Sequence, residues 1–86
     1  MEKYNIRFKR SAVKELETIP KNDLQKIIKR IQDLSSNPRP AGSQKLSNSG
    51  HHRVRQGDYR IIYLIIDAVK TVEIYKVSHR KEVYRS

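Results

Sequence analysis

The segment YRIIYLII, residues 59–66, constrains this chain most, because it is almost entirely apolar. A strand carries side chains on both faces, so we expect this one to be covered on both faces or central in a sheet. Turn signals bound it, Gln56-Gly57-Asp58 before and Asp67-Ala68 after. Its apolar run, 61–66, is far shorter than the roughly 20 residues that a membrane helix needs. We therefore expect a soluble protein without a membrane partner.

Alternation with period two predicts three further strands. Residues 51–56 and 70–78 flank the apolar segment and predict an antiparallel meander with it. In residues 3–9, Tyr4, Ile6 and Phe8 share one face. This N-terminal strand must join the same sheet to bury them.

Between the predicted strands at 3–9 and 51–56, apolar residues recur at helical spacing. Ser11 stands where an N-cap is expected, and a short helix is predicted over about 11–18, ended by Pro20. A second helix carries one apolar stripe at helical spacing. Its members are Leu24, Ile27, Ile28, Ile31 and Leu34. The two helices predict an α-hairpin.

The predicted order is β-α-α-β-β-β, an α+β fold in a single domain spanning residues 1–86. The helical hairpin covers one face of the sheet and leaves the opposite face free. Residues 35–50 are rich in Ser, Asn, Pro and Gly and are expected to form a loop, with Lys45-Leu46 as its only anchor.

The composition is strongly basic, with 19 Lys and Arg against 9 Asp and Glu and a formal charge of +10. Such a surface suits phosphate backbones or an acidic partner. There is no cysteine, which excludes thiolate metal sites and fits a reducing compartment. The N-terminus lacks the apolar stretch of a signal peptide. We expect a cytoplasmic protein.

Arginines gather around one predicted turn. Arg53 and Arg55 lie two apart on one strand and share a face, and the turn returns Arg60 beside them. His79, Arg80 and Tyr84 follow the neighbouring last strand. Each has a simpler explanation: a solvated edge strand for Arg53 and Arg55, a surface histidine for His79, and packing for Tyr84. Arg60 heads an apolar strand, so a partner for its charge is expected.

No pair of carboxylates suits a metal nuclease, and adjacent His51 and His52 point to opposite faces of a strand. Nuclease activity, if present, is therefore expected to need no metal and no cofactor. RNA permits this, because its own 2′-hydroxyl can attack the adjacent phosphorus. The protein then supplies cations for the developing charge and groups that accept and donate protons.

The segments ELETIPKNDLQKIIKRI, HRVRQGDYRIIYLI and VSHRKEVYR together resemble the RelE toxins of the RelE/ParE superfamily, over nearly the whole chain. The resemblance implies the RelE-like fold and the toxin of a type II toxin–antitoxin pair. It further implies a ribosome-dependent mRNA endonuclease that cleaves the codon in the A site and leaves a cyclic phosphate. The alternative is a ParE-like toxin that binds DNA gyrase and cleaves no RNA.

By this resemblance, Arg60 and Arg80 hold the scissile phosphate, and Tyr84 stacks on a base or helps to move the proton. Arg53 or Arg55 stabilises charge or transfers a proton, and Lys45 joins the arginines in binding RNA. Arginine hardly ever loses its proton, so His79 becomes the candidate for part of the acid–base work. Ser47 stands where some relatives carry another arginine.

The implied partners are an acidic RelB-like antitoxin, the 70S ribosome and mRNA. The antitoxin is expected to lie across the basic surface or the helical hairpin, and to exclude the toxin from the ribosome or displace the tail with Tyr84. Operator DNA is expected to be bound only through the antitoxin complex.

Overall fold

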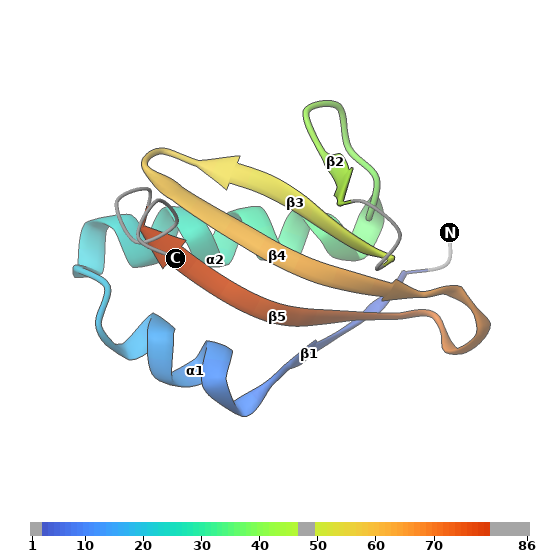
Figure 1. The fold of residues 1–86 in the computed structure, drawn as a ribbon, viewed down its shortest axis with the longest axis horizontal. Coiled ribbons are helices and arrows are strands. Elements are labelled where there is room, and N and C mark those ends of the chain that lie inside the picture. The colour runs from blue at the N-terminus through green and yellow to red at the C-terminus, as the bar shows by residue number, and fades with distance from the viewer. Residues whose placement is uncertain (1–2, 47–49, 80–86) are drawn as a thin grey trace.

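The computed structural model describes residues 3–46 and 50–79 and contains a five-stranded sheet with two helices (Figure 1). In chain order the elements are β1 (Asn5–Phe8), α1 (Arg10–Glu17), α2 (Lys21–Ser36), β2 (Gln44–Leu46), β3 (His51–Gln56), β4 (Tyr59–Ile66), the short 3₁₀ helix η1 (Asp67–Val69) and β5 (Thr71–His79). The strand order is β1-β5-β4-β3-β2, with only the β1–β5 pair parallel. The predicted α+β class and the central place of residues 59–66 are confirmed.

Strand β1 joins the sheet as its period-two pattern predicts. It pairs with β5 in parallel, from Asn5 opposite Thr71 to Phe8 opposite Ile74. Tyr4, Ile6 and Phe8 pack against the core from this edge. The pairing leaves the end of β5 beyond Ile74 without a strand neighbour on that side, and α1 contacts β5 there.

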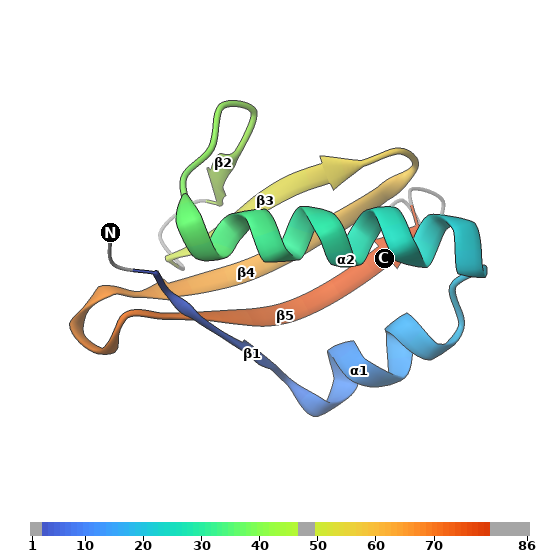
Figure 2. The same cartoon turned by 180° about the vertical axis from the view of Figure 1, so that it is seen from behind.

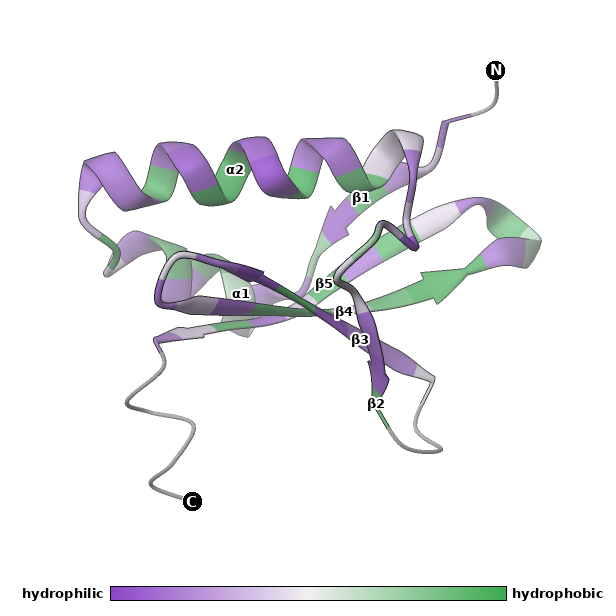
Figure 3. Ribbon diagram, turned by 90° about the horizontal axis from the view of Figure 1, so that it is seen from above, coloured by the Kyte–Doolittle hydropathy of each residue, from purple (hydrophilic) through white to green (hydrophobic). Residues whose placement is uncertain are grey.

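The core lies between α2 and the sheet (Figure 2). The apolar stripe of α2 buries Ile27, Ile31 and Leu34, and Figure 3 shows the apolar side of α2 turned toward the strands. The sheet contributes one face of alternating buried side chains, which we call the helix face. Its buried members are Val54, Ile61, Tyr63, Val72, Ile74 and Val77. The side chains that alternate with them form the other face, which we call the open face.

The start of α1 differs from the prediction. Ser11 is not the N-cap; the helix begins at Arg10, the cap is Lys9, and its side chain makes no capping hydrogen bond. The end of β1 decides this start, because the Lys9 N–H donates to the Ile74 carbonyl at 3.0 Å while the Lys9 carbonyl accepts from Ala12 at 2.9 Å. One residue thus closes the strand ladder and opens the helix.

The expectation that residues 35–50 form only a loop is wrong, because Gln44–Leu46 form β2. This strand pairs with β3, with Gln44 opposite Arg53 and Leu46 opposite His51. Three residues are too few to show a periodic pattern, so the pairing itself makes them a strand. The sheet therefore has one more strand than the sequence predicts.

Side-chain hydrogen bonds hold the segment after α2 in place. The buried Tyr63 hydroxyl donates to the Pro38 carbonyl at 2.7 Å. Asp67, at the β4–β5 connection, accepts from the Tyr4 hydroxyl at 2.5 Å and from Arg39 at 2.9 Å. These contacts fix the approach to β2, which borders the candidate site. Neither described helix has the length and apolar character to cross a membrane.

Candidate nucleic-acid interface

Arg55 and Arg60 occupy directly opposed positions on β3 and β4. Directly opposed residues of an antiparallel pair lie about 5 Å apart at Cα and project from the same face. Both alternate with buried neighbours, Val54 and Ile61, so both guanidinium groups start from the open face. The structure therefore brings together two of the predicted arginines at the turn.

Arg53 extends this basic surface along β3. It lies two residues from Arg55, about 7 Å along the strand, on the same face. Gln44 is its partner on β2, and the Gln44 side-chain oxygen accepts a hydrogen bond from the Arg53 guanidinium. Gly42, Gln44, Arg53 and Arg55 line a notch of about 270 Å³. We call Arg53, Arg55 and Arg60 the arginine cluster.

Two predicted site residues stand apart from the arginine cluster. Lys45 is exposed and pairs with His52, so it alternates with Gln44 and belongs to the helix-face side of β2. His79 pairs with Tyr59 across the end of β5 and β4. It lies two residues after the buried Val77, which also places it on the helix face. The sheet thus separates His79 from the arginine cluster, although both lie near the β3–β4 turn.

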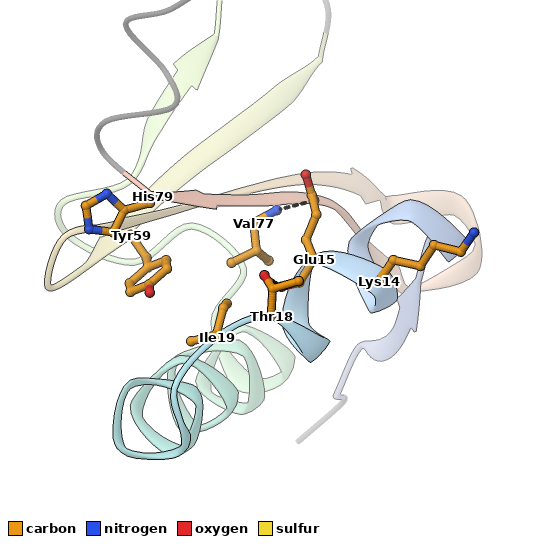
Figure 4. Close-up of a pocket in the computed structure, with 7 residues that line it drawn as sticks. All are labelled: Lys14, Glu15, Thr18, Ile19, Tyr59, Val77 and His79. Atoms are coloured by element: carbon orange, nitrogen blue, oxygen red, sulfur yellow. Dashed lines mark hydrogen bonds between the residues drawn. The ribbon is translucent and has the colours of Figure 1, made fainter.

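His79 borders a cleft between α1 and the end of the sheet (Figure 4). The cleft has a volume of about 430 Å³ and is lined by Lys14, Glu15, Thr18, Ile19, Tyr59, Val77 and His79. The rings of Tyr59 and His79 meet edge to face, with centroids 5.1 Å apart. Glu15 accepts the Val77 N–H at 3.0 Å, which satisfies a donor on the uncovered edge of β5.

Arg80 and Tyr84 lie outside the described residues, so their predicted roles remain predictions. Sequence reasoning missed Gln44 as a neighbour of the cluster. Its only sequence signal is its position one residue before the Lys45-Leu46 pair, and the pairing with Arg53 appears only in the sheet register. The described residues contain no group of three or more His, Cys, Asp or Glu side chains placed to hold a metal.

Burial shifts the pKa of two side chains behind the notch. The His52 ring stacks on Tyr63, with centroids 5.8 Å apart, on the face opposite His51. Burial and the positive charge of Arg39 hold the pKa of His52 below its ordinary value. Burial also raises the pKa of Tyr63, so its hydroxyl stays protonated and donates to Pro38.

The arginine cluster supplies planar, permanently charged donors on a rigid sheet. A guanidinium binds phosphate through paired hydrogen bonds and keeps its proton at any physiological pH. Three such groups on adjacent strands are suited to a phosphodiester and to the extra charge of a pentacovalent phosphorus. They are unsuited to accepting a proton, so the chemistry of this face is binding and charge stabilisation.

Comparisons with known proteins converge on one class of toxins. The family described as "ParE toxin of type II toxin-antitoxin system, parDE" matches residues 6–84. The toxin RelG of Mycobacterium tuberculosis is 33% identical over 84 residues, covering 95% of this chain and 97% of the relative. The putative toxin RelE1 of Methanocaldococcus jannaschii is 28% identical over 88 residues, covering 98% of each.

Solved structures give the same result. The toxin–antitoxin complex RelBE2 of M. tuberculosis contains a chain with a TM-score of 0.83 and 32% identity, covering 93% of this chain and 94% of that one. The archaeal RelE–RelB complex of Pyrococcus horikoshii contains one with a TM-score of 0.81 and 29% identity, covering 90% and 94%. The sheet, the two helices and their order are thus those of RelE toxin structures.

Proposed function

This chain belongs to the ParE toxin family within the RelE/ParE superfamily of type II toxin–antitoxin toxins, and we propose that it acts there as a ribosome-dependent mRNA endonuclease. The relatives named RelE and RelG, rather than ParE, support the nuclease branch. The observation that carries the proposal is the pairing of Arg55 with Arg60, flanked by Arg53, on one face of the sheet.

In the proposed reaction, the 2′-oxygen forms a bond to phosphorus and the bond from phosphorus to the 5′-oxygen breaks. The 2′-hydroxyl loses its proton and the departing 5′-oxygen gains one, which leaves a cyclic phosphate and a 5′-hydroxyl. Arg60 and Arg80 hold the phosphate, and Arg53 or Arg55 stabilises the charge that develops on it. Neither step needs a metal or a cofactor.

Proton transfer falls to groups outside the arginine cluster. Arginine hardly ever releases its proton, which leaves His79 and Tyr84 as the candidates along this chain. His79 lies across the sheet from Arg60, in the cleft with Tyr59. We therefore propose that His79 reaches the reaction only if the end of β5 rearranges on the ribosome, and that Tyr84 is the other candidate for the proton transfer.

The partner that we propose is an acidic RelB-like antitoxin. Two observations support this partner: the formal charge is +10, and two of the solved relatives are complexes of RelE with RelB. Its binding would cover the cations that RNA needs. The toxin is proposed to act in the cytoplasm, on the 70S ribosome and its mRNA.

Primer extension on ribosome-bound mRNA tests the nuclease. The wild-type toxin should produce cuts within A-site codons, and Arg60→Ala should reduce them by a factor of about 100 to 1,000, as expected when a charge-stabilising donor is lost. Lys29→Ala, which removes one charge from the exposed side of α2, should cut like the wild type. Equal cutting by wild type and Arg60→Ala would refute the assignment of the arginine cluster.

The matched family is named for ParE, which favours a second candidate: a toxin that inhibits DNA gyrase and cleaves no RNA. The two functions separate in one comparison. Inhibition of gyrase supercoiling with intact ribosome-bound mRNA would select this alternative, whereas codon-specific cuts with normal supercoiling would exclude it.

A further inference from the structure

Three side chains from distant parts of the chain meet on the open face beside the arginine cluster, where His51 lies two residues before Arg53. Lys9 follows β1, His51 begins β3 and Tyr75 lies in β5. The Lys9 ammonium stands 3.9 Å from the centroid of the Tyr75 ring. The His51 ring meets the same tyrosine at a centroid distance of 4.6 Å and an interplanar angle of 64°. We call these three residues the aromatic cluster.

The register places the aromatic cluster on the face that carries the arginines. The side chains of His51, Arg53 and Arg55 emerge from the face of β3 opposite to the buried Val54. His51 therefore shares the open face with the two arginines. In β5, the pairing shifts between Ile62 and Tyr63 of the neighbouring strand. Tyr75 is the additional residue of this bulge, because Ile74 pairs with Tyr63 and Lys76 pairs with Ile62.

The Tyr75 ring is held by its neighbours but is not buried in the core. Its side chain is 38% exposed, which makes it one of three exposed large hydrophobic residues in the described part of the chain. A cation on its ring and an imidazole against it restrict its rotamers. A bulge that turns an aromatic ring outward beside lysine and histidine is a typical device for re-aiming a side chain near a functional surface.

We propose that the aromatic cluster is a nucleobase-binding subsite for single-stranded RNA, an inference that rests on the proposed function. An aromatic ring stacks on any base, and a cation beside it binds the adjoining phosphate. His51 lies four residues before Arg55, about 13 Å along the strand. The stacked base therefore belongs to a nucleotide neighbouring the cleaved bond, while the scissile phosphate lies at the arginine cluster.

An apolar strip on β4 runs beside both clusters and suits an RNA strand. Ile62 and Leu64 of β4 are half-buried on the open face, where Ile62 pairs with Arg53 and Leu64 pairs with His51. Arg53 and Arg60 border the Ile62 end of this apolar strip, and Glu73, which pairs with Leu64 at the other end, is held by Arg7 at 3.1 Å. The Lys9 ammonium on the Tyr75 ring supplies a further positive charge, and proteins bind single strands in basic grooves with interspersed aromatic rings. An acidic antitoxin segment would be drawn to the same cations but has no need of a stacking ring.

Binding of two short oligomers to the isolated toxin tests the subsite. One is a fluorescein-labelled oligomer of 2′-O-methyluridine, which cannot be cleaved, and the other is its abasic counterpart of equal length. Tyr75→Leu, which keeps apolar volume without a π system, should weaken binding of the uridine oligomer about tenfold and leave the abasic one unchanged. Tyr75→Phe should bind both like the wild type.

Two controls make the result specific. Val69→Ala alters another exposed apolar side chain and should leave both affinities unchanged. Arg60→Ala should weaken both oligomers alike, because it acts on phosphate. Thermal unfolding of each variant shows whether it is folded, and His51→Ala provides a second variant of the subsite with the same expected pattern.

Several results would overturn the subsite. They are equal binding of base-bearing and abasic oligomers by the wild type, equal losses of both in Tyr75→Leu, or no measurable binding of either. Weaker capture of an acidic antitoxin peptide by Tyr75→Leu with unchanged RNA binding would assign this surface to protein docking instead. Cleavage enters none of these measurements, so failure of the nuclease proposal is seen separately by primer extension.

Discussion

Arg55 and Arg60 face each other directly across the β3–β4 hairpin, so two positive charges share one cross-strand position. Like charges at opposed positions destabilise a sheet, with pair effects of roughly 0.2–1 kcal/mol. A fold selected for stability alone would place opposite charges here. Under the proposed function, an RNA phosphate would bind between the two guanidinium groups.

Replacing Arg55 by Gln should separate function from stability. The free energy of unfolding should stay unchanged or rise by up to about 1 kcal/mol, because the repulsion disappears. RNA affinity should fall, and the slope of log K against log salt should become shallower by about 0.7, the value for one phosphate contact on a single strand. Urea denaturation and salt titrations of RNA binding measure both. A variant that is less stable and equally salt-dependent would contradict the anion site.

Glu15 should stabilise the uncovered edge of β5 through its oxygen atoms more than through its charge. Its carboxylate accepts the Val77 N–H at 3.0 Å and lies 3.4 Å from the Lys76 ammonium, an exposed ion pair. Glu15→Ala leaves the amide without this acceptor and should cost about 1–3 kcal/mol, whereas Glu15→Gln keeps an acceptor and should cost less than about 1 kcal/mol. Chemical denaturation of both variants, with the exposed Glu17→Ala as reference, checks this order.

The Tyr63 hydroxyl should contribute more to stability than the Tyr4 hydroxyl. Both donate a hydrogen bond, Tyr63 to the Pro38 carbonyl from a fully buried position and Tyr4 to the exposed Asp67. Tyr63→Phe leaves the Pro38 carbonyl unsatisfied and should cost about 1–3 kcal/mol, whereas water can replace the hydroxyl in Tyr4→Phe. Matched unfolding curves measure the difference; equal costs would mean that the segment before β2 does not depend on this bond.

Acidification below neutral pH should destabilise the fold through His52. Burial and Arg39 hold its pKa below the ordinary value near 6.5, so the folded state binds fewer protons than the unfolded state as pH falls through that value. Stability should therefore decline between about pH 7 and pH 5. Asp67 affects stability at lower pH than His52 does. Hydrogen bonds from Arg39 and Tyr4 depress the pKa of Asp67, so its contribution to stability is lost only as pH falls below the ordinary aspartate range.

Thermal unfolding across this pH range measures the effect. His52→Gln should flatten the decline above about pH 5, because the neutral amide has no proton to take up. His51→Gln, on the other face of the same strand, serves as the comparison. A decline of equal steepness in wild type and His52→Gln would assign the acid sensitivity to another group.

Much of the fold was predictable because its patterns are local. Alternation in residues 3–9 and 51–56 reports a half-buried strand whatever its partner, and the stripe from Leu24 to Leu34 reports a helix that packs on something apolar. The arginines at 53, 55 and 60 could be placed together because a tight hairpin fixes their register. The start of α1 and the strand at 44–46 escaped prediction because residues far away in the sequence decide them.

The sequence by itself determined the two periodicities, the basic charge and the turn that pairs Arg55 with Arg60, since each depends on residues within a few positions of one another. Only the tertiary structure decided that His79 lies across the sheet from those arginines and that a bulge places Tyr75 beside His51 on the face that carries them. The face on which a strand residue emerges depends on pairing register, and a shift of one residue reverses it. That register is set by partners on other strands and by the helices that bury one side, which no local pattern records.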